Sequence, residues 1–259
     1  MNTSLAGRRA LVCGASRGIG RACAEALAEH GASVTVLGRR METLEPVRDS
    51  LGAGDHHCLC VDLADWKEAG RIVAEHAAGL GPIHVLVNNS GGPKAGPAID
   101  ADPEEYIAGF TPHVLGSQAM AQALVPGMRN ESYGRIINIV STSVVTPISG
   151  LGVSNVVRGA MGNWMRILAK ELGPDGITVN NILPGFVGTE RLDSLMAGRA
   201  ERDGVTAADV EATWKSTIPA GRFADPSEIG SVCAFLASEA AAYVSGVNLP
   251  VDGARIAAN

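Results

Sequence analysis

The sequence predicts an α/β protein built on one doubly wound parallel sheet of about seven strands with helices on both faces. Short β-branched or apolar runs alternate with helix-periodic segments along the whole chain, and this alternation is typical of such a sheet. A glycine-rich turn follows the first of these runs and precedes the first helical pattern. A length of 259 residues suits one domain over 1–259 with room for a substantial core.

The expected elements follow one another along the chain. Strands are predicted at 10–13, 33–37, 57–61, 83–88, 135–140, 177–183 and 246–250. Helices are predicted at 19–30, 42–51, 65–78, 103–128 with an interruption at Pro112, 153–171, 206–215 and 226–237. The charged, alanine-rich segment 189–218 has no strong period, and we interpret it as a lid over the ligand site. That site is expected at the carboxyl ends of the strands.

The glycine-rich turn spans residues 14–20 and reads Gly-Ala-Ser-Arg-Gly-Ile-Gly. A strand, a glycine turn and a helix in this order predict a dinucleotide site, because the first N–H groups of the helix face the pyrophosphate. Gly14 permits the turn, Gly18 lets backbone approach the phosphates, and Gly20 lets the helix pack on the sheet. An ordinary glycine turn is the alternative. The residues expected to contact the cofactor here are Gly14, Ser16, Arg17, Gly18, Ile19 and Gly20.

The end of the second strand indicates which dinucleotide is bound. An NAD site usually has an acidic residue at this point to hold the ribose hydroxyl. Here Gly38 is followed by Arg39 and Arg40. Because arginine is a permanently charged fork suited to phosphate, we expect NADP(H), with Arg39 and Arg17 on the 2′-phosphate. A solvated basic turn is the alternative.

Composition narrows the class of partner. The formal net charge of −6 argues against a general nucleic-acid binder. The five cysteines have neither metal-ligand spacing nor the arrangement of a disulfide framework, so no metal site is expected. Neither a signal peptide nor an apolar run long enough to cross a membrane is evident. We therefore expect a reduced cytoplasmic protein that acts on a small molecule.

Several motifs in order resemble the short-chain dehydrogenase/reductase family in its single-domain form, such as the 3-oxoacyl-carrier-protein reductases. The turn after Cys13 resembles the family's cofactor motif on a Rossmann-type domain, and residues 88–91 resemble its Asn-Asn-Ala-Gly motif, with Ser90 in place of alanine. Residues 184–189 resemble the segment that cups the nicotinamide. The resemblance implies further cofactor contacts from Asp62, Leu63, Asn89, Gly91, Arg158, Pro184, Gly185, Val187 and Thr189.

The catalytic positions depart from the family pattern of Asn, Ser, Tyr and Lys. The resemblance assigns the family serine to Ser141 and the tyrosine position to Ser154. Four residues later Arg158 stands at the lysine position, and His113 stands at the asparagine position. An aliphatic hydroxyl is far less acidic than a phenol, and arginine stays protonated, so neither simply replaces the usual pair.

Among these four side chains, His113 has a reference pKa near neutrality, of about 6.5. We therefore expect His113 to supply the proton, through Ser141, Ser154 or a water, unless it is only a helix histidine bonded to a neighbouring backbone group. Arg158 is expected to hold a ribose or a substrate oxyanion, with a structural arginine as the alternative. Whether Tyr106 or Tyr133 enters the site is left open.

The sequence thus predicts an NADP(H)-dependent oxidoreductase with a substituted proton relay, acting on a small or medium carbonyl, a secondary alcohol or an activated alkene. A non-redox isomerase, dehydratase or lyase on the same scaffold is one alternative, and a catalytically silent NADP(H)-binding sensor is another. The resemblance also implies a homo-oligomer, a tetramer or dimer. Met161, Trp164, Met165 and Leu168 form an apolar helix face that serves either assembly or the core.

Overall fold

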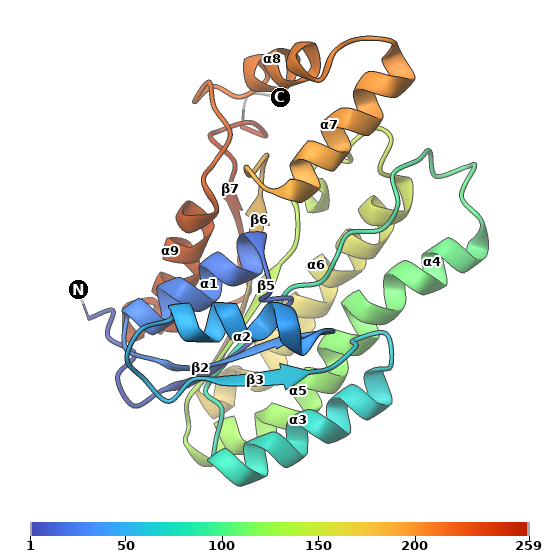
Figure 1. Cartoon of the computed structure of the whole chain (residues 1–259). Coiled ribbons are helices and arrows are strands. Elements are labelled where there is room, and N and C mark those ends of the chain that lie inside the picture. Colours follow the sequence, from blue (N-terminus) through green and yellow to red (C-terminus); the bar gives the residue numbers. More distant parts are fainter. Residues whose placement is uncertain (1, 258–259) are drawn as a thin grey trace.

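Seven parallel strands form one central sheet in the computed structural model, which describes residues 2–257 (Figure 1). The strand order is β3-β2-β1-β4-β5-β6-β7. Their bounds are Arg9–Cys13 for β1, Ser33–Gly38 for β2, His57–Cys60 for β3, Val85–Asn88 for β4, Gly134–Ile139 for β5, Ile177–Pro184 for β6 and Asn248–Val251 for β7. The order reverses between β1 and β4, which opens a crevice at the carboxyl edge. The predicted doubly wound fold is confirmed.

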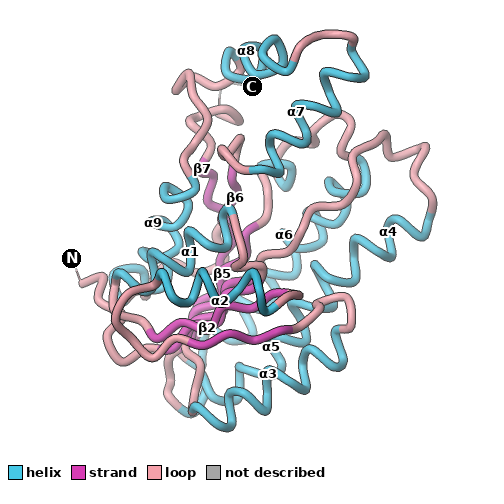
Figure 2. The backbone as a smooth tube through the Cα atoms, in the orientation of Figure 1, coloured by secondary structure: helices cyan, strands magenta, loops and turns pink. Residues whose placement is uncertain are grey.

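Helices cover both faces of the sheet (Figure 2). One face carries α1 (Gly18–Glu29), α2 (Met41–Ser50) and α9 (Pro226–Ala237), whose apolar residues share a core cluster with Val12, Val36 and Val87. The other face carries α3 (Trp66–Leu80), α5 (Gly116–Asn130) and α6 (Gly152–Leu172), which pack around Leu11 and Leu86. Successive side chains of each strand point to opposite faces, so both clusters draw on the same strands.

The long helical pattern predicted over 103–128 is interrupted at Pro112, as expected. Helix α4 (Pro103–Phe110) passes into a π-helical turn, Thr111–Leu115, before α5 begins at Gly116. Proline cannot donate its own backbone hydrogen bond, and π turns, although rare, are often found at functional sites. The turn carries His113 inward, where its side chain is buried.

The segment 189–218 forms two helices, α7 (Glu190–Asp203) and α8 (Ala207–Ser216), above the carboxyl edge of the sheet (Figure 1). They enclose a small core of their own, in which the rings of Phe186 and Trp214 stack with centroids 4.7 Å apart. Thr189 caps α7, and Gly204 ends it in the left-handed conformation. The sequence had not suggested that 190–203 is helical.

Two of the four residues on the apolar face of α6 are buried in the core. Met161 and Met165 are 3% and 0% exposed. Trp164 and Leu168 pack beside them against buried residues. Met161 and Met165 therefore belong to the core, whereas Trp164 and Leu168 are half-buried at its edge.

Four asparagines form a hydrogen-bonded ladder across β4, β5, β6 and β7. Asn88, Asn138, Asn181 and Asn248 are register partners in turn. The first three each donate from Nδ2 to the Oδ1 of the next, at 2.9, 2.8 and 2.8 Å, and Asn248 is the last acceptor. Asn138 and Asn181 are 1% and 0% exposed, so these buried amides have one another as hydrogen-bond partners.

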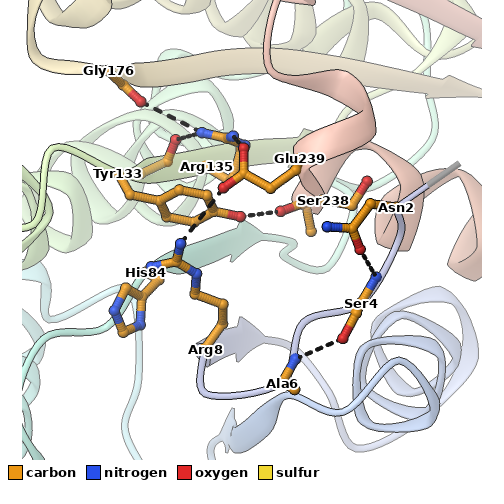
Figure 3. A network of polar contacts seen from close by, with 12 residues as sticks. Asn2, Ser4, Ala6, Arg8, His84, Tyr133, Arg135, Gly176, Ser238 and Glu239 are labelled. Atoms are coloured by element: carbon orange, nitrogen blue, oxygen red, sulfur yellow. Dashed lines mark hydrogen bonds and ion pairs between the residues drawn. The ribbon is translucent and has the colours of Figure 1, made fainter.

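A second polar network surrounds Tyr133 (Figure 3). The Tyr133 ring lies between the guanidinium groups of Arg8 and Arg135, at 3.6 and 4.1 Å from its centroid. Its hydroxyl donates to the Ala237 carbonyl at 2.7 Å. Because Tyr133 precedes β5 whereas Ser141 follows it, the two residues lie at opposite ends of that strand.

Candidate functional site

The glycine turn has the geometry that a phosphate cradle needs. Gly14 and Gly18 have φ values of +59° and +56°, a conformation that side-chain-bearing residues rarely adopt. A Cβ on Gly20 would lie 2.2 Å from the Gly14 carbonyl oxygen, so the helix approaches the turn as closely as glycine allows. No side chain of the described residues caps α1, which leaves the N–H groups of its first turn for an anion. Ser16 and Ile19 lie half-buried in the same turn.

The segment after β6 meets the glycine turn. A Cβ on Gly18 would lie 3.3 Å from the Thr189 Cγ2, and Arg17 forms an ion pair with Glu190. Upstream, Pro184 ends β6, and Gly185 donates from its backbone to Val251. Val187 is buried at 4% exposure. These contacts gather the predicted 184–189 segment and the predicted turn at one edge of the sheet.

Asn89 joins the end of β4 to the same turn. Its Nδ2 donates to the carbonyls of Cys13 and Gly14, at 3.3 and 3.2 Å. The neighbouring Gly91 is exposed, and its carbonyl faces the π turn, where it accepts from His113.

The residues predicted for the adenosine half lie at the ends of β2 and β3. Arg39 and Arg40 are exposed directly after β2, whose Leu37 carbonyl accepts from Ala15 of the glycine turn at 3.1 Å. Asp62 is exposed after β3 and accepts from the Ala64 backbone. Leu63 is half-buried beside it.

His113 is held as a neutral imidazole. Its Nε2 lies 3.0 Å from the Gly91 carbonyl, which only accepts, so Nε2 carries the proton. Its Nδ1 therefore accepts from the Ser90 hydroxyl at 2.5 Å. Burial first, and then the charge of Arg158, lower the pKa of His113 to about 3. The reference pKa on which its expected role as a proton donor near neutral pH was based does not apply in this environment.

Arg158 is a buried cation. It is 9% exposed and donates from Nη1 to the Ile139 carbonyl at 2.9 Å. Its Nε is buried with no hydrogen-bond partner among residues 2–257. Burial first, and then the charge of Arg191, lower the pKa of Arg158 to about 10, so it stays protonated at neutral pH.

A small cavity of about 10 Å³ lies between His113 and Arg158, which stand at the family's asparagine and lysine positions. His113 and Arg158 line it together with Ser90, between the ends of β4 and β5 and helix α6. This cavity has room for about one water molecule. Ser141 and Ser154 do not line this cavity.

Ser141 and Ser154 border the site from two elements. Ser141 follows β5 and accepts from the Ser143 backbone at 3.1 Å, which caps the short helix Thr142–Val144. Ser154 is half-buried in the first turn of α6, one turn before Arg158. The Tyr106 hydroxyl donates to the Ala98 carbonyl on the loop before α4.

Two residues of the site were missed by the sequence reading. Ser90 contacts His113, so two departures from the family motif form one hydrogen-bonded pair. Arg191, in the first turn of α7, donates from Nη2 to the Pro93 carbonyl at 2.8 Å. The sequence contained a signal for Ser90, because Ser90 replaces the alanine of the family motif and His113 replaces the family asparagine.

The burial of His113 makes the stability of the protein depend on pH in a defined direction. The folded pKa of about 3 lies below the unfolded value of about 6.5, so the unfolded chain binds the proton first as pH falls. The His113 contribution is present above pH 6.5 and is lost toward pH 3. From pH 7 to 5, wild type should lose about 2 kcal/mol more unfolding free energy than His113→Asn. Urea denaturation at both pH values measures this; equal losses would mean that the imidazole titrates normally.

Comparisons with known proteins agree with this geometry. A sequence profile described as Enoyl-(Acyl carrier protein) reductase matches residues 14–254. The 3-oxoacyl-(acyl-carrier-protein) reductase FabG of Vibrio harveyi is 32% identical over 252 residues, covering 96% of this chain and 98% of that protein. The L-sorbose reductase of Gluconobacter frateurii, solved with NADPH and L-sorbose, is 29% identical with a TM-score of 0.91, covering 98% of both chains.

A second solved structure gives the same picture. The gluconate 5-dehydrogenase of Burkholderia cenocepacia, in complex with NADP and tartrate, is 28% identical with a TM-score of 0.91 and covers 100% of this chain and 98% of its own. Among residues 2–257, no helix is long and apolar enough to cross a membrane.

Proposed function

Since the chain belongs to the short-chain dehydrogenase/reductase family of NAD(P)-dependent oxidoreductases, we propose that it uses NADPH to reduce an activated carbon–carbon double bond. The observation that carries this proposal is the buried guanidinium of Arg158, whose Nε has no partner among the described residues. A fixed cation of this kind stabilises a developing oxyanion without delivering a proton. The segment 189–218 serves as the substrate lid.

The proposed reaction separates hydride transfer from protonation. NADPH, when bound, would supply a hydride to the β-carbon of an enone, with cleavage of the carbon–carbon π bond. Its electron pair moves onto the carbonyl oxygen, and Arg158 stabilises the resulting enolate, with Ser141 and Ser154 as hydroxyl donors. A proton from water then bonds to the α-carbon. The products are the saturated ketone and NADP⁺.

Reduction of a ketone carbonyl fits these side chains less well. It forms an alkoxide, which is more basic than an enolate and needs a nearby acid. Arg158 holds its proton, and His113 has a pKa of about 3. Both of its ring nitrogens are already hydrogen-bonded, to Ser90 and Gly91.

One substrate distinguishes the two reductions. With trans-β-acetylacrylate, which carries both a ketone and a conjugated double bond, we expect NADPH oxidation with levulinate as the product, identified by NMR. Formation of the unsaturated alcohol would instead assign carbonyl reduction. Cofactor binding without oxidation would favour the sensor, and a changed product without oxidation would favour the non-redox enzyme.

We also propose that this chain prefers NADP(H), with Arg39, Arg40 and Arg17 around the 2′-phosphate. The glycine turn and uncapped α1 fit the pyrophosphate, and exposed arginines rather than an acidic residue follow β2. Replacing Arg39 by glutamine should weaken NADPH binding about tenfold and leave NADH binding nearly unchanged, because the lost interaction is charge-assisted. Isothermal titration measures both. Arg48→Gln, which removes the same charge from the far end of α2, is the control. Equal wild-type affinities for the two cofactors would contradict the preference.

A further inference from the structure

We propose that one water molecule, bound in the cavity of about 10 Å³, links Ser117 and Asn88 to Arg158 and fixes the direction of its guanidinium. Ser117 is thereby a positioning residue, because it acts through Arg158 and not on the substrate. Its role in the reaction rests on the proposed function, in which Arg158 stabilises the enolate.

The cavity has the size and the polar groups that a single bound water needs. Three buried polar side chains line it from three elements: Asn88 of β4, Ser117 of α5 and Arg158 of α6. They are 5%, 5% and 9% exposed, so they are largely shielded from bulk water. A buried water is held where it finds about two to four polar partners, and these side chains offer three.

All three side chains have hydrogen-bonding groups that lack a partner within residues 2–257. The Ser117 hydroxyl forms no hydrogen bond there, and the Oδ1 of Asn88 accepts none, although its Nδ2 donates to Asn138. The Arg158 guanidinium has five N–H groups, and its Nη1 donates to the Ile139 carbonyl while its buried Nε has no partner. Buried polar groups without partners cost free energy, and a water that bonds to them removes much of that cost.

Water matches the groups that remain around the cavity. Ser90 and His113 also line it, but their side chains bond to one another, and the other ring nitrogen donates to a backbone carbonyl. Arginine can only donate and an amide oxygen can only accept, whereas water does both. The water therefore accepts from the Arg158 guanidinium and donates to the Asn88 Oδ1, and the Ser117 hydroxyl supplies its third contact.

The asparagine ladder supplies the acceptor of this site. Its hydrogen bonds all run from Nδ2 to Oδ1 in the direction from β4 to β7, so the oxygen left unused is the Oδ1 of Asn88. Asn88 is also the ladder residue that lines the cavity with Arg158. Hydrogen bonds in series strengthen one another, so the ladder holds the Asn88 amide and, through the water, the guanidinium.

Two points of attachment keep the guanidinium in one orientation. Its Nη1 donates to the Ile139 carbonyl at 2.9 Å, and the water holds a second donor. The remaining N–H groups then keep one direction toward the enolate oxygen, and donors that are already in place stabilise an oxyanion best. Without the Ser117 hydroxyl, the water has two partners instead of three, so the guanidinium turns more freely. Ser117 therefore affects kcat more than KM.

The kinetic test replaces Ser117 by alanine and uses NADPH with trans-β-acetylacrylate. We expect kcat to fall about tenfold and KM to change less than twofold, because the loss concerns stabilisation of the transition state. In an Arg158→Met background, Ser117→Ala should change kcat less than twofold, because no guanidinium is left to position. Ser238→Ala, which removes a buried hydroxyl outside the cavity, is the matched control and should leave kcat and KM unchanged. An unchanged kcat in Ser117→Ala, or an equal loss in both backgrounds, would overturn the positioning role.

Crystal structures of wild type and Ser117→Ala test the water site without turnover. Wild type should show one ordered water within about 3.2 Å of the Ser117 Oγ, the Asn88 Oδ1 and an Arg158 nitrogen. The alanine variant should lose most of that density, and a water that stays fully occupied there would overturn the role of Ser117. If wild type holds the water but never oxidises NADPH, the proposed reaction fails and the water site stands. If wild type holds no water there, the site fails whatever the enzyme catalyses.

Discussion

Replacement of Arg158 by methionine is expected to lower kcat/KM for the enone by about 10²–10³, the usual loss for one oxyanion-stabilising group. The same replacement should leave the unfolding free energy unchanged or raise it by up to about 2 kcal/mol, because a buried cation without a counter-ion opposes folding. The lost bond to the Ile139 carbonyl works against this gain. Steady-state kinetics and urea denaturation measure the two effects on the same preparation.

The opposite signs of these two effects make the experiment informative. If Arg158 only supported the packing of α6 on β5, methionine would lower stability and activity together. Arg158→Lys keeps the charge and should retain at least a tenth of the activity. A methionine variant that is fully active would remove Arg158 from the mechanism.

Replacement of Asn138 by alanine is expected to lower the unfolding free energy by about 2–6 kcal/mol. Asn138 accepts from Asn88 and donates to Asn181, so its loss leaves a buried donor and a buried acceptor without partners. Each such group costs about 1–3 kcal/mol. Since a typical domain is stable by about 5–15 kcal/mol, the shift in the urea midpoint should be large.

The control for this change is Asn163→Ala on the exposed face of α6, which removes the same atoms from a solvated position. It should alter the unfolding free energy by no more than about 0.5 kcal/mol. Comparable destabilisation by the two substitutions would show that the asparagine ladder contributes nothing beyond ordinary side-chain loss.

The features that the sequence predicted correctly depend on local pattern. The strands ending at Cys13 and Gly38 are buried apolar runs, and the turn between β1 and α1 needs glycine at positive φ. The expected break at Pro112 follows from the missing N–H of proline. Such signals are contained in a few consecutive residues, so they survive without knowledge of the tertiary structure.

Helix α7 was missed because it buries little surface. Only Leu192, Met196 and Ala200 of its residues are buried, so no apolar stripe stands out against its charged residues. Its ends did carry a signal: Thr189 precedes an acidic first turn, and Gly204 follows the last helical residue. Caps, rather than periodicity, identify a helix of this kind.

The site chemistry depended on contacts that no local pattern encodes. Ser90 and His113 are 23 residues apart, and Arg191 reaches a carbonyl 98 residues earlier in the chain. The sequence predicts only the reference pKa of a free imidazole for His113, whereas burial in the folded protein lowers this pKa to about 3. The motif positions could therefore be predicted from the sequence. The protonation state of His113 and the contact between Arg191 and Pro93 could not.

The ion pair between Arg17 and Glu190 would link the proposed nucleotide site to the proposed lid. A phosphate that binds Arg17 would have to break the ion pair between Arg17 and Glu190, which lies in the first turn of α7. A lid held closed by that ion pair would then lose this contact. By thermodynamic reciprocity, closure through this pair weakens nucleotide binding by the same factor that the nucleotide weakens closure. Because both side chains are more than 70% exposed, that factor is at most about fivefold. If both proposals hold, the nucleotide and the lid would antagonise each other mildly, which would favour entry of the nucleotide while the lid is open.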